Sequence, residues 1–545
     1  MSLLSALVAV VVLVQSPPPA TRVPTETLGR AYALFLEARE MQEANDLEGA
    51  IAAYRRITEM APQAAEVHAE LALLFARRGN ADESFREAAA AIAIEPDNRT
   101  ARRVRGLVKA DLAGATTDRS RAVALGTEAL ADLEHVASDR LSDPVVGLTL
   151  ARMYVLVGQH EKAIDRLGAF LLDRPGFPEA LLLLADAHEG RRDFASAVRA
   201  LQDVVADRPD QGRLWVRLGT LHERLGQWRE AAEAWGRLVT RDPRALPYRV
   251  RQATALVNAG NLAMGREVIA GVTAEAPRDI PAWYLLSQIE RRLGNATRAE
   301  EAARQIAAID PDDARGLLAL AEAKSARSDY RGVVGTLEPR VRSPRAEDTA
   351  TGYFAQMADQ LATAHGEMGD HKRALAVLED ARRRDARNVS LLFSLGAAYE
   401  RAKRYEDAER TLRGVIAAEP EHAEALNYLG YMLADRKVNL GEAVDLISRA
   451  LAIEADNPSF LDSLGWAYVQ QANLTAAREP LQRAATALPR VSVIQDHLAE
   501  LYFRLNLYAD AAATWDRALA GDRSGVDVGE ITKKRNRARG LSERK

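Results

Sequence analysis

Large apolar residues recur along this chain at helical spacing, and the whole arrangement repeats every 34 residues. The clearest period covers residues 458–489 and has these positions: Leu461, Leu464, Gly465, Tyr468, Ala477, Leu481, Ala484 and Pro489. Because residues three and four apart lie on one face of a helix, each half of the period predicts one amphipathic helix. The small Gly465 lets the first helix approach the second, and Pro489 cannot continue the second helix. The pattern therefore predicts a pair of antiparallel helices joined by a short turn.

The same period continues through most of the chain. Its closing proline recurs at steps of 34 residues, as Pro175, Pro209, Pro243, Pro277 and Pro311. We count 13 recognisable units and one divergent unit. The predicted segments are repeat units over 31–98, 144–346 and 355–525, a divergent helical unit over 99–143, a hinge over 347–354, and a basic capping helix or tail over 526–545. The expected fold is all-α: an α-solenoid in which each helix pair covers its neighbours.

This order of large residues, small residues and proline resembles the tetratricopeptide repeat over about nine tenths of the chain. The resemblance implies a right-handed superhelix with a concave groove. A second likeness is confined to the C-terminal third, where Leu426–Tyr468 is similar to a segment of exported bacterial tetratricopeptide scaffold proteins. Those proteins include the lipoprotein adaptor of a carboxyl-terminal processing protease. The likeness implies an envelope scaffold, although this chain lacks the cysteine on which such relatives are often lipidated.

The N-terminus begins with an apolar run, Leu3–Val14, followed by three prolines. Such a run is too short for a membrane span and is typical of a signal peptide. We therefore expect a signal peptide over residues 1–16 with cleavage near Ser16 or Ala20, and a Pro-rich linker over 17–30. The predicted location is exported, either periplasmic or attached to the envelope. The alternatives are an uncleaved anchor, which would be the chain's one membrane contact, or a misassigned start and a cytoplasmic protein.

Composition and charge exclude several classes of function. The chain has no cysteine, so disulfides, thiolate metal sites and cysteine nucleophiles are excluded. A net charge of -4 gives no electrostatic reason to expect nucleic acid as a partner. The tail from Val526 is rich in basic residues and holds few acids, and we interpret it as a solvated cap of the last repeat. A basic arm that contacts anionic lipid or nucleic acid is the alternative for this tail.

The histidines and tryptophans follow the repeat rather than a catalytic motif. Two repeat positions that elsewhere hold aromatic residues hold these histidines: His160, His188, His222, His365 and His371. We expect these side chains to pack between helices, and we expect these tryptophans to lie in the core: Trp215, Trp235, Trp283 and Trp515. The chain has no metal-binding histidine pair and no Gly-rich phosphate loop. We predict no enzyme activity, no cofactor and no metal; an unrecognised catalytic site could lie only in residues 99–143.

Positions on the first helix of each pair that face the groove carry the candidate partner-binding residues. Helical geometry places the second, fifth, ninth, twelfth and thirteenth positions of that helix on one stripe. The candidate residues on this stripe are Tyr284, Arg291, Phe393, Asn427, Tyr431, Asp462, Trp466 and Asp496. Aromatic residues between polar ones suit a peptide-binding surface. In the alternative interpretation, Tyr431 and Trp466 merely pack against a neighbouring repeat.

The same stripe predicts the charge of the partner. Asp462, Asp496 and Glu500 would repel a C-terminal carboxylate, so a basic or amide-rich segment suits the groove better. We therefore predict a non-enzymatic protein–protein interaction scaffold or adaptor of the bacterial cell envelope. Its partners would be other proteins or peptide segments, with no nucleic acid and no small-molecule substrate. The alternative function is a structural component of a polysaccharide-export or pilus-assembly complex.

Overall fold

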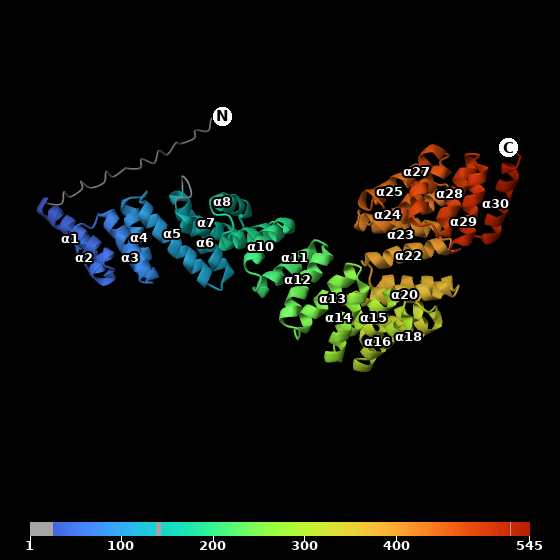
Figure 1. Ribbon diagram of the computed structural model, residues 1–545, viewed down its shortest axis with the longest axis horizontal. Helices are drawn as coiled ribbons and strands as arrows, with labels where there is room; N and C mark the ends of the chain where they lie inside the picture. Colours follow the sequence, from blue (N-terminus) through green and yellow to red (C-terminus); the bar gives the residue numbers. More distant parts are fainter. Residues whose placement is uncertain (1–24, 138–142, 524, 545) are drawn as a thin grey trace, which may run out of the picture. The chain divides into compact units, whose positions relative to one another are not determined.

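A computed structural model describes residues 25–137, 143–523 and 525–544 of the chain. These residues form thirty α-helices and no strand, which confirms the predicted all-α solenoid class (Figure 1). The expected signal peptide and both candidate cleavage positions lie outside the described residues. By its internal contacts the chain divides into two units, Met1–Gly260 and Asn261–Lys545, and each is described by itself.

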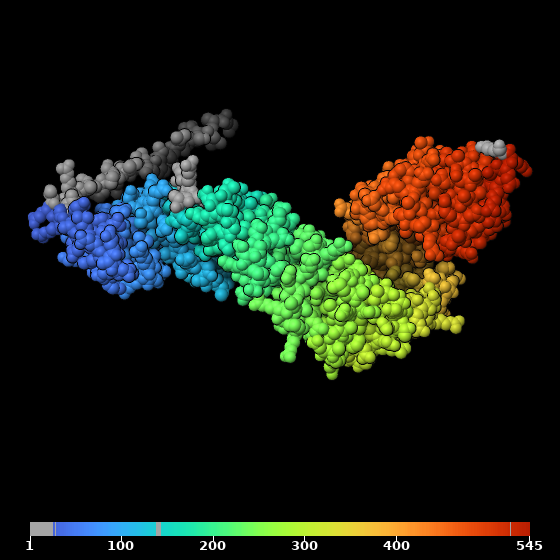
Figure 2. Space-filling view, in the orientation of Figure 1, coloured from blue at the N-terminus to red at the C-terminus, as the bar shows by residue number. Residues whose placement is uncertain are grey.

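Unit 1 contains thirteen helices within its described residues. Their bounds are α1 Thr25–Glu43, α2 Leu47–Met60, α3 Ala65–Arg77, α4 Ala81–Ile94, α5 Arg99–Ala115, α6 Arg119–Val136, α7 Pro144–Leu156, α8 His160–Asp173, α9 Pro178–Gly190, α10 Phe194–Asp207, α11 Gly212–Arg224, α12 Trp228–Arg241 and α13 Leu246–Asn258. The first twelve helices form six pairs of consecutive helices, each pair packs on the next, and α13 packs on α12. Figure 2 shows the colours of successive segments following one another in order along this unit, as expected for a repeat array.

Unit 2 contains seventeen helices within its described residues. Their bounds are α14 Leu262–Glu275, α15 Ile280–Arg292, α16 Ala296–Ile309, α17 Ala314–Ser325, α18 Tyr330–Arg342, α19 Ala346–Ala350, α20 Tyr353–Glu367, α21 His371–Arg384, α22 Val389–Arg401, α23 Tyr405–Ala418, α24 Ala423–Asp435, α25 Leu440–Ile453, α26 Pro458–Gln470, α27 Leu474–Ala487, α28 Ser492–Arg504, α29 Tyr508–Ala520 and α30 Val528–Ser542. The first helices of successive pairs contact one another in the order α15, α17, α20, α22, α24, α26 and α28. They form one continuous row, and we name its side of unit 2 the first-helix face.

The recurring prolines end the second helix of a pair, as the sequence predicts. A residue that precedes proline is pushed out of the helical region of backbone space. Ala61, before Pro62, has φ −136° and ends α2, and Leu488, before Pro489, has φ −125° and ends α27. Proline thus enforces the end of the helices that it follows, and α21 and α25 end at a similar φ, −132° and −126°, before an alanine.

Small residues at the predicted position bring the two helices of a pair together. A Cβ added to Gly465 of α26 would lie 2.4 Å from Leu481 Cγ of α27. A Cβ added to Gly219 of α11 would lie 2.6 Å from Trp235 Cε2 of α12. Atoms so close would clash, so the helix spacing in these pairs requires glycine.

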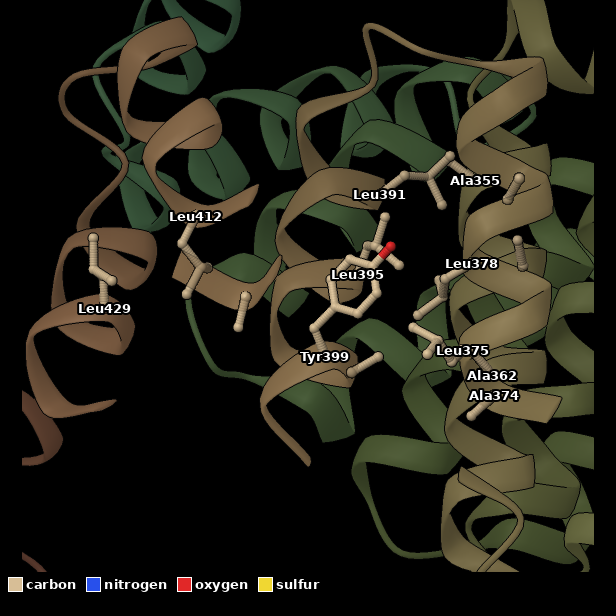
Figure 3. Packing of buried hydrophobic residues seen from close by; sticks show 14 of the residues in the cluster. Ala355, Ala362, Ala374, Leu375, Leu378, Leu391, Leu395, Tyr399, Leu412 and Leu429 are labelled. Carbon is tan, nitrogen blue, oxygen red and sulfur yellow. The ribbon is translucent and has the colours of Figure 1, made fainter. Parts of the chain in front are cut away.

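Buried aliphatic side chains fill the space between pairs. In Figure 3, Leu391 and Leu395 of α22 point toward Leu378 of α21, and Leu412 of α23 lies on the other side. Among the tryptophans expected in the core, Trp235 and Trp515 are each 1% exposed. The other two, Trp215 and Trp283, are only half-buried. Their indole N–H groups donate to the carbonyls of Pro209 and Pro277, at 2.8 and 2.9 Å, which holds them at the edge of the core.

The divergent segment consists of the long helices α5 and α6 with a buried ion network between them. Asp132 is 1% exposed. Its carboxylate accepts hydrogen bonds from Arg105 Nε and Nη2, both at 2.7 Å, and Arg102 and Lys109 lie 3.4 and 3.7 Å away. The hydrogen bond to Asp132 raises the pKa of the Arg105 guanidinium, although burial opposes it. All of these partners of the Asp132 carboxylate come from α5, the other helix of the same pair.

The expected hinge and the basic tail each contain a helix. The expected hinge, 347–354, contains most of α19. Its Asp348 is 2% exposed and accepts a hydrogen bond from Arg340 Nε at 2.6 Å. In the basic tail, α30 packs on α29 through Ile531 and Ala538, which are 2% and 0% exposed. Arg539 pairs with Asp516 of α29 at 2.7 Å.

Candidate partner-binding surface

The predicted partner-binding residues all lie in unit 2, on first helices of the row that forms the first-helix face. They come from five helices, α15, α22, α24, α26 and α28. Their side chains fall into three groups: one on α15, one around the start of α22 and α24, and one over α24, α26 and α28. The structure therefore brings them into a common row but not into one compact site.

The first group surrounds Glu322 of α17. Arg291 Nε lies 3.3 Å from Glu322 Oε2, and Gln360 Nε2 of α20 donates to Glu322 Oε1 at 3.3 Å. Burial raises the pKa of the Glu322 carboxyl above its usual range, and Arg291 opposes that effect. Burial and the nearby Glu322 also raise the pKa of Tyr284. Arg291 thus pairs with a partly desolvated carboxylate of its own unit, and the charge of that carboxylate acts on the Tyr284 hydroxyl.

The third group is built around His497, which is 5% exposed. His497 Nδ1 lies 3.0 Å from both carboxylate oxygens of Asp462. The ring of Trp466 stacks on the imidazole with centroids 4.2 Å apart and planes 13° apart. Tyr431 approaches the same imidazole at 6.2 Å, and Trp466 Nε1 donates to Asp435 Oδ1 at 3.4 Å. Three first helices thus share one buried ion pair.

The carboxylates around His497 set its protonation. Burial alone would lower the pKa of His497, but Asp462, followed by Asp496 and Asp435, outweighs burial and raises that pKa above its ordinary value. Burial is also the main cause that raises the pKa of Tyr431. The cluster therefore favours an imidazolium held against Asp462, a pair that is costly to bury unless it is well matched.

The acids from which the sequence predicts a basic partner already have partners within unit 2. Asp462 binds His497. Asp496 accepts from Trp515 Nε1 at 2.6 Å and lies 3.4 Å from Lys534 Nζ. Glu500 accepts from Arg504 Nε at 3.0 Å. Because these partners neutralise them, the three carboxylates supply less attraction for a basic segment than their sequence positions suggest.

The second group lines an open cleft of about 730 Å³ formed by α20, α22 and α24. Phe393 is half-buried, with its ring 5.3 Å from His422 and 5.8 Å, edge to face, from Tyr428. Tyr428 in turn donates to Glu400 at 3.2 Å. Asn427 lies further along α24, and its buried Oδ1 has no hydrogen-bond partner among the described residues.

Neither His497 nor the cleft was predicted from the sequence. His497 occupies the sixth position of its first helix, next to the stripe. A histidine at that position, one repeat after Asp462, was the available signal. Among the other histidines, His222 and His365 are buried as expected, at 5% and 2% exposure. His371 is exposed, contrary to expectation, because it is the first residue of α21 and projects into solvent.

Two further findings concern metal sites and membrane spans within the described residues. Residues 25–137, 143–523 and 525–544 contain no group of three or more histidine, aspartate or glutamate side chains that could hold a metal ion. Within the same ranges, no helix has the length and apolar character needed to cross a membrane.

Repeat profiles identify the family. Tetratricopeptide repeat profiles match residues 35–101, 148–212, 182–245, 280–323, 367–431 and 404–460. Together these matches cover more than half of the chain, and the protein belongs to the tetratricopeptide repeat family.

A relative and several solved structures illustrate what this chain is similar to. TPR repeat-containing protein PA4667 of Pseudomonas aeruginosa is 32% identical over 163 residues, which is 30% of this chain and 28% of that protein. This chain therefore matches less than a third of that relative's length. Cut9–Hcn1 of the APC/C is 13% identical over 95% of this chain and 98% of its own, with a TM-score of 0.41. Yeast Tom70 is 12% identical over 95% of this chain and 96% of its own, with a TM-score of 0.36. Naa15/Naa10 bound to HypK-THB is 15% identical over 94% of this chain and 96% of its own, with a TM-score of 0.33.

Proposed function

We propose that this protein is a non-enzymatic scaffold of the bacterial cell envelope that binds segments of partner proteins along the first-helix face of unit 2. One observation carries the proposal: seven first helices form a continuous row with a cleft of about 730 Å³ and half-buried aromatic side chains. Such side chains offer apolar area at little entropic cost and act as anchors for a partner. Family membership supports the same general role.

An adaptor role in the envelope rests on separate support. The apolar run Leu3–Val14 has the length of a signal-peptide core, and one similar protein is bacterial. Mass spectrometry of the mature N-terminus tests this part of the proposal. Cleavage near Ser16 or Ala20 is the expected result, and an intact Met1 on a protein that fractionates with the cytoplasm would overturn it.

Site-specific photocrosslinking in cells tests the binding face. A benzophenone side chain would replace Ser390 or Gln470 on first helices, and Glu406 or Asp445 on second helices as controls. Ser390, Glu406 and Asp445 are exposed, and Gln470 is half-exposed, so these replacements spare the core. We expect adducts with partner proteins from the two first-helix positions and few from the controls. Equal adducts from all four positions in a stoichiometric complex would favour the structural role in an export or pilus assembly instead.

A further inference from the structure

We infer that the cleft around Phe393 is the docking site for a cationic side chain, arginine above all, of an extended partner segment. We name this space the Phe393 cleft; it is lined by α20, the N-terminal half of α22, and the turn and first residues of α24. This inference rests on the proposed function and adds to it the chemistry that a partner must bring.

The cleft is large enough for a side chain and its flanking backbone. Its volume of about 730 Å³ lies within the range of ordinary ligand pockets. It opens on the first-helix face, because its residues belong to α20, α22 and α24 and to the turns before α20 and α24. An extended segment that follows the row of first helices would therefore pass over it.

Negative charge in the Phe393 cleft is not neutralised. Asp359, Glu419 and Glu421 line it, and none of the three has an arginine or lysine within ion-pair distance among the described residues. No arginine or lysine lines the cleft at all, and His422, its one basic residue, lies 3.2 Å from Glu424. Asp462, Asp496 and Glu500 further along the face differ, because each already holds a cation or an N–H donor. Unpaired negative charge in unit 2 is therefore available to a partner at the Phe393 cleft.

The floor of the cleft favours a planar cation. Phe393 presents a half-buried ring, held in place by Tyr428 and His422. A guanidinium stacks on an aromatic ring more readily than an ammonium and donates several hydrogen bonds in one plane. Ser390 and Ser394 also line the cleft, and neither hydroxyl is bonded to another described residue. These groups match an arginine side chain better than a lysine.

Peptide binding to the full-length protein tests this inference. The probe is a fluorescent, end-blocked dodecapeptide of serine and glycine with one central arginine, measured by fluorescence polarisation at about 20 mM salt, where screening is weak. Three variant peptides replace arginine by lysine, by neutral citrulline of nearly the same shape, or by glutamate. We expect affinity to fall from arginine to lysine, and by about tenfold or more for citrulline, because citrulline makes no charge-assisted hydrogen bonds.

Protein variants locate the site. The double variant Asp359→Asn, Glu421→Gln should weaken the arginine peptide about tenfold, and Phe393→Leu should reduce the advantage of arginine over lysine. The control Glu406→Gln, Asp445→Asn removes the same charge from exposed positions on second helices and should bind as wild type. Circular dichroism verifies that each variant is folded. Equal binding of the arginine and citrulline peptides, or equal loss in the control variant, would overturn the inference.

This result is separable from the crosslinking test of the scaffold role. Crosslinks from Gln470 that persist while the arginine peptide fails to bind would overturn the cation site and leave the scaffold standing. Peptide binding at the Phe393 cleft without any crosslinked partner in cells would support the cation site and count against the scaffold.

Discussion

A buried histidine between carboxylates makes the stability of unit 2 depend on pH. The groups that face His497 are Asp462 and Asp435 on neighbouring first helices and Asp496 beside it, and their charges raise its pKa above the unfolded value of 6.5. A raised pKa means that the folded state binds the proton more tightly. The stabilisation is therefore complete below about pH 6.5 and is lost as the pH rises through the raised pKa of His497.

Asp462→Asn should remove this dependence. We expect the variant to be less stable than wild type by about 1–3 kcal/mol, because it loses a charged hydrogen bond to a buried group. The difference should be largest near pH 6 and smaller near pH 9, measured as urea midpoints of unit 2 signals such as Trp466 fluorescence. A difference that stays constant over this pH range would show that the imidazole is neutral in the folded protein. Asp445→Asn, exposed on α25, is the matched control and should not change the midpoint.

At the level of single residues, the sequence predicted on which face of its helix a side chain lies, but not which other residues it contacts. Helical spacing places Asp462, Trp466 and Asp496 on one stripe, as found. The basic residues that pair with the two aspartates lie about one repeat further along the chain: His497 lies 35 residues from Asp462, and Lys534 lies 38 residues from Asp496. One repeat period fixes which residues face the same way, but side-chain length and rotamer decide which of them touch. Asp462 and Asp496, which the stripe suggested as free carboxylates, are therefore paired, whereas the unpaired carboxylates lie around Phe393.

Between the two helices of a pair, one glycine sets the distance. A Cβ added to Gly430 of α24 would lie 2.6 Å from Ile447 Cγ1 and 2.9 Å from the backbone carbonyl of Ala443, both on α25. Since the backbone cannot move aside cheaply, Gly430→Ala should destabilise unit 2 by about 1–3 kcal/mol. Gly414→Ala, exposed in the middle of α23 with open space around it, should instead stabilise by about 0.5–1 kcal/mol. Opposite shifts in melting temperature would confirm the steric cause, and parallel shifts would contradict it.

The turn inside most pairs imposes a second backbone requirement, because it contains a residue with positive φ. Gly294 has φ +80° with nothing near its Cβ position. Ala472 has the same role in the α26–α27 turn with φ +58°. Because a left-handed conformation costs an L-residue about 1–2 kcal/mol, Gly294→Ala should destabilise and Ala472→Gly should stabilise by about 1 kcal/mol each. Chemical denaturation followed by circular dichroism measures both, and a loss of stability on Ala472→Gly would argue against this cause.

Helix pairs were the most predictable level of this structure. Their ends depend on local rules that a sequence displays directly, such as the residue before Pro489 leaving the helical region. The short helix α19 was not foreseen, because Asp348 is fixed by Arg340 of the preceding helix, a tertiary contact. Half-burial of Trp215 and Trp283 likewise depends on hydrogen bonds to the preceding turn and not on their slot in the repeat.

At the scale of the whole molecule, contacts remain local along the chain. Every substantial helix contact among the described residues joins helices that are adjacent or separated by one other helix, except α17 with α20, where the short α19 intervenes. An array of this kind behaves as a one-dimensional series in which stability is shared only between neighbours. A defect in one pair should therefore loosen nearby pairs and leave distant ones unaffected.

Leu395→Ala tests this locality. Leu395 is fully buried between α21, α22 and α23 (Figure 3), and its truncation should cost about 2–5 kcal/mol through lost contacts and the cavity that remains. Amide hydrogen exchange should then quicken in α20–α25, while amides of α5–α9 in unit 1 keep their wild-type rates, because no substantial contact connects the two sets of helices. The matched truncation in unit 1, Leu150→Ala, should give the reverse pattern, since Leu150 of α7 is also fully buried. Faster exchange in both units from either single substitution would mean that the chain unfolds as one cooperative body.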